Sequence, residues 1–246
     1  MTSPCLVDLY SGDLNGRPNL AAYLAAGAPW SLIVLKATEG LSYPESASDR
    51  QWFFTNWPTI GVLAGDRLGQ DFFRGAYHYL RVDQNPVDQA DFYMQLVSIA
   101  GGVGPGDLPA IVDVEGANNP EGASAQQVID SVTLFSERII DVTGKRPILY
   151  GGSYLRDRAI VDHMGCQLLW IAAYGQTLPS HLYTSIGWSL DELFAWQYQG
   201  TEGPSGPDGY PRQCPIGDGP VDLSAITIAD GQAPEAQLAW IRDHLT

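Results

Sequence analysis

The feature that most constrains the fold is an alternation between short apolar segments and longer helix-like segments. Each apolar segment is rich in β-branched or aromatic residues and is bounded by Gly, Pro or Asp, which is typical of strands. We expect strands at 6–10, 31–37, 73–80, 110–115 and 147–152, followed by helices near 18–26, 46–64, 85–100, 124–143 and 153–163. Five strand–helix units in succession predict a parallel sheet of the α/β class.

The pattern changes after residue 163. Segments 168–175, 194–200 and 221–226 are predicted strands, joined by stretches rich in Pro, Gly and Ser, and PEAQLAWIRDHL is a predicted closing helix. Eight strands predict a TIM-like barrel whose last third lacks its helical coat. Since such barrels commonly reach about 250 residues as one domain, we expect the 246 residues to form a single domain, 1–246.

Two carboxylates end the fourth predicted strand, in the segment PAIVDVEG. Asp113 and Glu115 are two residues apart, so they share one face of the strand at a backbone separation of about 6.6 Å. Nearby like charge and partial desolvation both raise a carboxyl pKa, which is how general acids are made. The alternative is a strand-end Asp that caps the next loop beside a solvent-exposed Glu.

Barrel closure adds two further acids to this pair. Reactive groups of α/β barrels collect at the C-terminal ends of the parallel strands. Asp8 lies in the first predicted strand and Asp222 at the start of the eighth, and closure makes these strands neighbours. The sequence therefore predicts a cluster of Asp8, Asp113, Glu115 and Asp222, although Asp8 could instead only bind backbone amides.

Aromatic residues of the predicted strands are candidate ligand contacts at the same mouth. Because side chains alternate along a strand, about half of these rings should pack against the helices. The candidates are the aromatic residues Tyr79, Tyr150, Tyr174 and Trp196, together with the polar Gln197. His78 is either a hydrogen-bonded core residue or a site residue and is given no catalytic role, and Lys36 and Glu39 are expected to form a structural ion pair.

Composition excludes several classes of partner. With 13 Lys plus Arg against 28 Asp plus Glu, the formal charge is −15, which disfavours binding to nucleic-acid phosphates or acidic membrane surfaces. Cys5, Cys166 and Cys214 have neither zinc-site nor disulfide-framework spacing, although one disulfide stays open. The segment MTSPCLVDLY lacks the basic and apolar regions of an export signal, and no apolar run is long enough to span a membrane.

Eight short strings, taken in order, resemble glycoside hydrolase family 25, the Chalaropsis-type lysozymes. They are VDLYSGD, LKATEG, GAYHYL, PAIVDVEG, PILYGG, LWIAAYG, FAWQYQG and VDLS, and together they span nearly the whole chain. The resemblance implies a (β/α)5(β)3 barrel and an N-acetylmuramidase that cuts the β-1,4 bond between N-acetylmuramic acid and N-acetylglucosamine. It implies that Glu115 is the general acid, that Asp113 is a nucleophile or steers the substrate's acetamido group, and that Asp8 and Asp222 flank them.

The chain departs from the family pattern in two places. LVDLY stands where GIDVS is common, which leaves a sugar-contacting role for Tyr10 open, and Ala173 stands where an aromatic residue is frequent, so Tyr174 would replace it. The segment EGPSGPDGYPRQCPIGDGP could fold over the groove. No separate wall-binding domain is expected.

The chemistry has a physical basis, because a glycosidic oxygen needs a proton to leave and an oxocarbenium-like centre needs a negative charge or an internal nucleophile. We expect retention of configuration, with assistance from the acetamido group or Asp113, and no cofactor. One alternative is a metal-dependent barrel hydrolase using Asp8, His78, Asp113, Glu115 and Asp222, although no HxH pair is present. Another is a non-catalytic glycan-binding or effector module.

The expected partner is bacterial peptidoglycan. The protein is expected to be a monomer and to bind neither nucleic acid nor membrane. A protein made without a visible signal peptide would reach the wall as a phage endolysin released through a holin, or as a secreted or delivered effector. An antimicrobial, wall-degrading role follows.

Overall fold

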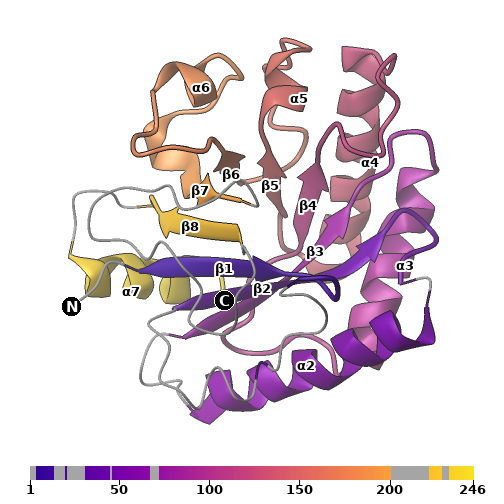
Figure 1. Ribbon diagram of the computed structural model, residues 1–246, viewed down its shortest axis with the longest axis vertical. Helices are drawn as coiled ribbons and strands as arrows, with labels where there is room; N and C mark the ends of the chain where they lie inside the picture. The colour runs from indigo at the N-terminus through magenta and orange to yellow at the C-terminus, as the bar shows by residue number, and fades with distance from the viewer. Residues whose placement is uncertain are drawn as a thin grey trace.

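The computed structural model describes residues 4–13, 20, 31–44, 46–66, 72–200, 222–228 and 233–246, and its centre is a closed barrel of eight strands (Figure 1). Strands that follow one another in sequence are neighbours in the barrel, and β8 closes it against β1. The strands are β1 (Cys5–Leu9), β2 (Leu32–Glu39), β3 (Phe73–Tyr79), β4 (Ile111–Val114), β5 (Ile148–Gly151), β6 (Leu168–Ala172), β7 (Leu193–Gln199) and β8 (Asp222–Ile226).

Strand direction differs only at the closing strand. Strands β1 to β7 pair in parallel, whereas β8 is antiparallel to both β7 and β1. The residues that begin β8 therefore lie at the same barrel end as the residues that finish the parallel strands. The predicted barrel is confirmed, including all eight strands in their expected order.

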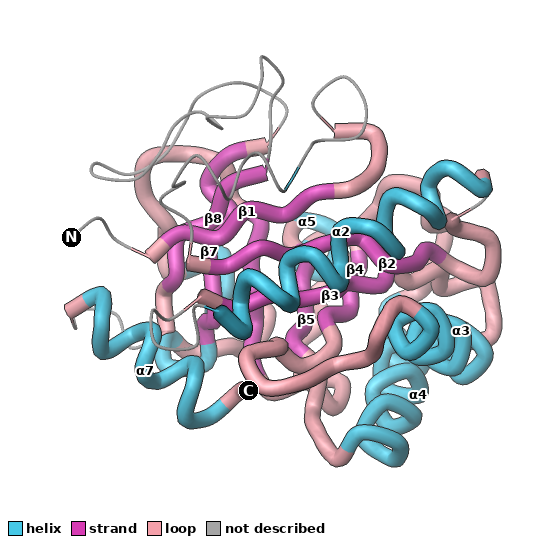
Figure 2. Tube along the Cα trace, turned by 90° about the horizontal axis from the view of Figure 1, so that it is seen from below, coloured by secondary structure: helices cyan, strands magenta, loops and turns pink. Residues whose placement is uncertain are grey.

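The helices are distributed unevenly around the barrel (Figures 1 and 2). Long helices follow the early strands, and α3 and α4 lie side by side in both views. The described helices are α2 (Ala47–Asp66), α3 (Pro86–Ile99), α4 (Ala125–Thr143), α5 (Ser153–Arg156), α6 (His181–Thr184), a 3-10 turn (Leu190–Glu192) and α7 (Pro234–His244). The sparse coat over the last strands agrees with the sequence.

One predicted helix is shorter than expected, and another lies almost entirely outside the described residues. The helix expected at 153–163 ends at Arg156, and Ala159 then adopts a left-handed backbone with φ 51°, which an α-helix does not allow. The helix expected near 18–26 lies outside the described residues, apart from Leu20, as does the segment 202–220 that could fold over the groove.

Local sequence fixes the ends of the two helices that flank β4. Asn85 caps α3 by accepting hydrogen bonds from the amides of Val87 and Asp88. Ser124 and Gln127 form a reciprocal capping box at the start of α4, and Gly144 ends that helix at φ 72°, in the left-handed region. These caps hold the segments that lead into and out of β4.

Side-chain alternation divides the barrel into an inner and an outer core. The inner cluster includes Leu6, Leu32, Ile111, Ile148 and Leu168, and the outer one packs the opposite strand faces against the helices. Two residues further along several strands, the inner face becomes polar, as at Asp8 and Asp113. One barrel end is therefore apolar and filled, and the other presents polar groups.

A buried cation ties α2, β3 and the loop before β4 together outside the barrel. Arg74 forms a two-point ion pair with Asp107, with Nε 2.5 Å from Oδ1 and Nη2 2.8 Å from Oδ2. Its guanidinium lies 3.8 Å above the Trp57 ring and also donates to the Trp57 carbonyl. Such a desolvated pair is stable only while both partners remain charged and bonded.

The cysteines that the structure describes are unpaired. Cys5 and Cys166 are buried free thiols, and burial raises the pKa of each to about 12. Cys214 lies outside the described residues. Within the described ranges, none of the helices combines the length and apolarity needed to cross a bilayer.

Candidate active site

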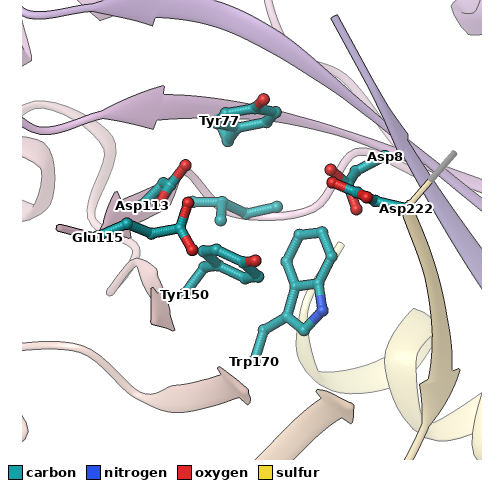
Figure 3. A pocket seen from close by; sticks show the side chains of 8 residues that line it. Asp8, Tyr77, Asp113, Glu115, Tyr150, Trp170 and Asp222 are labelled. Carbon is teal, nitrogen blue, oxygen red and sulfur yellow. The ribbon is translucent and has the colours of Figure 1, made fainter. Parts of the chain in front are cut away.

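The polar end of the barrel contains a small pocket that brings the four predicted acids together (Figure 3). Its cavity volume is about 50 Å³, and its walls are Asp8, Tyr77, Ile111, Asp113, Glu115, Tyr150, Trp170 and Asp222. Since a water molecule takes up about 30 Å³, the enclosed part holds one or two waters or the edge of a larger ligand. Figure 3 shows Asp8 and Asp222 on one side, facing Asp113 and Glu115 across the pocket.

Strand register explains the first pair of acids. Asp8 on β1 and Asp222 on β8 are directly opposite each other in an antiparallel ladder, so their side chains share the inner face. Burial raises the pKa of Asp222 to about 7, with added repulsion from Asp13 and Glu115, while the nearby Gln197 side chain lowers it. Burial and then the charge of Asp222 hold the pKa of Asp8 well above its ordinary value.

The second pair comes from the end of β4. Asp113 is 5% exposed, and its Oδ1 is buried without a hydrogen-bond partner. Burial and then the neighbouring Glu115 raise its pKa well above the ordinary value. Burial also raises the pKa of Glu115, while the neighbouring Tyr150 hydroxyl and the charge of Lys36 oppose that rise. Two carboxyl groups in this relation release their protons at higher pH than isolated carboxyl groups do.

The positive charge near these acids comes from Lys36 on β2. Its Nζ lies 2.6 Å from Glu39 Oε2, so the predicted ion pair is present. The same ammonium lies 5.0 Å from the Tyr43 ring centroid and 5.1 Å from that of Tyr79. Its charge lowers the pKa of both Asp113 and Glu115, so the pair acts on the pocket as well as on the strand end.

The five predicted ligand contacts do not all line the acidic pocket. Tyr150 lines the pocket, and its hydroxyl donates to Gln197 Oε1, so Gln197 is fully buried behind it. The Tyr79 hydroxyl donates to the backbone carbonyls of Glu115 and Ala117, which fixes the segment after β4. Tyr174 is 53% exposed and lines a neighbouring cavity that also contains Glu115.

The structure does not bring Trp196 to the pocket, contrary to the expectation. It is 6% exposed and packs in the outer core, edge-on to Tyr198, and its Nε1 donates to the Ala173 carbonyl at 2.5 Å. Side-chain alternation gives the reason, because Gln197 points inward and its neighbour must then point outward. Trp196 supports the wall from behind.

Three residues near the acids were missed by the sequence interpretation. Tyr77 and Trp170 line the pocket, and strand pairing explains their placement, since Tyr77 shares a face with Tyr79 and Trp170 is the register partner of Tyr150. Asp13 follows β1, and burial raises its pKa to about 6. A loop residue of this kind does not belong to the alternating pattern of a strand, so the sequence does not indicate that it lies at the barrel mouth.

His78 lies outside the barrel wall, in the outer core. Its ring stacks on Phe135, Nδ1 lies 2.7 Å from Thr38 Oγ1, and Nε2 lies 3.1 Å from Gln89 Oε1. Burial lowers its pKa to about 3, so the ring is neutral. It therefore cannot join the four acids, and within the described ranges no three His, Cys, Asp or Glu side chains are arranged to hold a metal ion.

Comparison with protein families and curated proteins gives a consistent result. The family model for glycosyl hydrolases family 25 matches residues 7–206. An N,O-diacetylmuramidase from Chalaropsis sp is 33% identical over 139 residues, which cover 54% of this chain and 59% of that protein. The chain thus spans about half the length of the curated relatives it matches.

Solved structures share the whole fold. A muramidase from Trichobolus zukalii has 21% sequence identity and a TM-score of 0.64, over 98% of this chain and 100% of that one. A bacterial lysozyme from Streptomyces coelicolor has 21% identity and a TM-score of 0.62, over 99% of each chain. At this identity the likeness establishes a common barrel architecture.

Proposed function

The chain belongs to glycosyl hydrolases family 25, and from this premise we propose that it is a lysozyme that hydrolyses peptidoglycan. The bond cleaved is the β-1,4 linkage between N-acetylmuramic acid and N-acetylglucosamine. The observation that carries the proposal is the pocket in which Asp113 and Glu115 face Asp8 and Asp222. A related curated protein bears the name N,O-diacetylmuramidase, which supports the same substrate class.

Glu115 is the proton donor in this proposal. Cleavage of the bond between the anomeric carbon and the leaving oxygen requires a proton on that oxygen, and a carboxylic acid with a raised pKa supplies it. Burial raises the pKa of Glu115, and unlike Asp113 it also borders the neighbouring cavity. Glu115 therefore lies where the sugar chain would pass from one space to the other.

Asp113 assists the anomeric centre. We assign it to hold the substrate's 2-acetamido group, whose carbonyl oxygen attacks the anomeric carbon as the leaving oxygen departs with the proton of Glu115. Water then attacks the same carbon, the bond to the acetamido oxygen breaks, and the water's proton returns to Glu115, so configuration is retained and no ester forms on the enzyme. The buried Oδ1 of Asp113 has no hydrogen-bond partner in the described part of the chain, which fits a group that binds a donor from the substrate.

Asp8 and Asp222 complete the proposed site from the opposite wall. Their carboxyl groups face the pocket from β1 and β8, where their oxygens stabilise positive charge that develops on the sugar ring. Tyr150 and Tyr174 are the proposed sugar contacts, with Tyr79 and Gln197 positioning Glu115 and Tyr150. No cofactor enters these steps.

The biological setting is part of the proposal. In this proposal residues 1–246 are one catalytic domain, and the active form is a monomer. The enzyme acts on the bacterial cell wall, which it reaches as a phage endolysin released through a holin or as a secreted or delivered effector. A strongly acidic protein of this kind is not expected to bind nucleic acid or acidic membranes.

The test is the Glu115→Gln variant, assayed by loss of turbidity of a peptidoglycan suspension. Turnover should fall by about 10³-fold or more, because the amide cannot donate the proton. Circular dichroism and thermal unfolding should match the unmodified protein, since Gln has the same shape. Lysis at an unchanged rate by the folded variant would refute the assignment of Glu115.

A further inference from the structure

A second cavity adjoins the candidate active site and shares Glu115 with it. It has a volume of about 260 Å³ and lies between the segments that follow β4, β5 and β6. Its walls are Glu115, Gly116, Gly152, Ser153, Tyr154, Arg156, Ala172, Ala173 and Tyr174. The cavity is about five times larger than the acidic pocket and is open beside the exposed ring of Tyr174.

The backbone around this cavity is held firmly. The Ala173 amide donates to the Gln197 carbonyl at 3.0 Å, and its own carbonyl accepts from Trp196. Gly152 approaches the next segment so closely that a Cβ there would lie 3.0 Å from the Ala172 carbonyl oxygen. A preformed wall of this kind suits a ligand site, because little ordering remains to be done on binding.

Arg156 is the cation of this cavity, and its side chain has no partner among the described residues. The residue is half-buried, its Nη1 is buried without a hydrogen bond, and no carboxylate of the described chain pairs with it. Among the described residues, every other buried or half-buried Lys or Arg has an ion pair or a side-chain hydrogen bond. These are Lys36, Arg74, Arg81, Arg138 and Arg158.

Arg158, two residues further on, shows what a structural arginine looks like here. Its guanidinium donates to the carbonyls of Ala123 at 2.9 Å, Tyr154 at 3.2 Å and Glu121 at 2.8 Å. It also stacks 3.6 Å from the centroid of the Tyr154 ring. Arg158 fixes the cavity wall, and Arg156 is left with its donors available.

Arg156 also has no evident role in tuning the acids. The charge that opposes the raised pKa of Glu115 comes from Lys36 on β2, and Arg156 does not contribute. A guanidinium that is partly desolvated, unpaired and set in an otherwise acidic protein is most stable when an external anion binds it.

We propose that this cavity binds a carboxylate of the glycan strand's lactyl or peptide substituent, with Arg156 as its ligand. The inference rests on the proposed function, since it places this group beside the bond that Glu115 cleaves. Sugar rings of the strand are neutral, so the anion must come from the substituent. The two sources are the lactyl carboxylate, free when the peptide is absent, and the carboxylates of the stem peptide.

The experiment compares the unmodified enzyme with Arg156→Gln on three soluble glycan fragments. The first carries stem peptides, the second has lost them to an amidase and keeps the lactyl carboxylate, and the third has its peptide carboxyls converted to amides. Arg146→Gln is the matched control, because it removes the same charge from an exposed site on the segment before β5.

We expect Arg156→Gln to raise KM on the peptide-bearing fragment by about tenfold or more, which is typical for loss of a charge-assisted hydrogen bond. The value of kcat should change little, Arg156→Lys should recover part of the loss, and Arg146→Gln should have no effect. On the amidated fragment the unmodified enzyme should itself show the raised KM. A loss on the peptide-bearing fragment identifies a stem-peptide carboxylate, whereas a loss confined to the amidase-treated fragment, in which the lactyl carboxylate is free, identifies the lactyl group.

Equal KM values for Arg156→Gln and the unmodified enzyme on both the peptide-bearing and the amidase-treated fragments would overturn the inference. So would an increase of the same size on the amidated fragment, since it would reflect a change of shape. Failure of the unmodified enzyme to cleave any of the fragments would instead contradict the proposed function, so the two failures are distinguishable.

Discussion

Replacement of Asp222 by Asn should make the protein more stable above neutral pH. The pKa of Asp222 is raised from 3.8 to about 7, chiefly by burial. Between these values the unfolded chain has released the proton while the folded protein keeps it, so stability falls as pH rises through this window. A shift of about three units at 1.36 kcal/mol per unit corresponds to about 4 kcal/mol, fully lost above about pH 8.

Asn cannot ionise, so this cost disappears in the variant. We expect Asp222→Asn to be up to about 4 kcal/mol more stable than the unmodified protein near pH 8 and nearly equal to it near pH 4. Relief of Asp8, whose pKa is raised partly by the charge of Asp222, acts in the same direction. The variant should lose peptidoglycan hydrolysis, so the acid is retained for function at a cost in stability.

Urea unfolding followed by tryptophan fluorescence between about pH 4 and pH 8 measures this effect. Asp157→Asn is the control, because it removes one negative charge from an exposed site. The reasoning is refuted if Asp222→Asn is less stable than the unmodified protein near pH 8. It is also refuted if the slope of stability against pH stays the same.

The other predictions concern the groups around this pocket. Asp113→Asn should lower kcat by about 10²-fold or more, and a glycosyl ester trapped on Asp113 and detected by mass spectrometry would contradict acetamido assistance. Lys36→Met should move the alkaline limb of the kcat/KM profile to higher pH, because the Lys36 charge lowers the pKa of Glu115. An unmoved limb would contradict the assignment of Glu115 as the acid that Lys36 influences. Asp107→Asn should lower the free energy of unfolding, measured in urea, by about 3 kcal/mol, since it leaves Arg74 buried without its charge partner. A decrease of less than about 1 kcal/mol would contradict a buried ion pair. Excess chelator should leave turnover unchanged, and lost activity restored by a divalent metal would contradict a purely carboxylate mechanism.

The barrel was predictable because its signals are local and repeated. Each strand is a short apolar run between turn residues, and helices such as α4 carry their own cap at Ser124 and their own stop at Gly144. The convergence of Asp8 and Asp222 also followed, since closing an eight-stranded barrel makes the first and last strands neighbours. The helix after β5 was overestimated, because helical propensity beyond Arg156 is overridden by the turn at Ala159.

The residues around the four acids were harder to predict from the sequence. An aromatic residue in a strand is equally suited to either face, and without a register the choice between Trp196 and its neighbours was open. Tyr77 and Trp170 needed the pairing of strands, and Asp13 needed the path of a loop. Arg156 could not be singled out, since its lack of a partner is a property of the folded chain.

The most direct test of the central claim is to identify the sugar ends released from purified peptidoglycan. After digestion, borohydride reduction and acid hydrolysis, mass spectrometry distinguishes reduced muramic acid from reduced glucosamine. The account predicts new muramic acid ends with the unmodified enzyme and none with the folded Glu115→Gln variant. New glucosamine ends, or muramic acid ends produced equally by the variant, would contradict it.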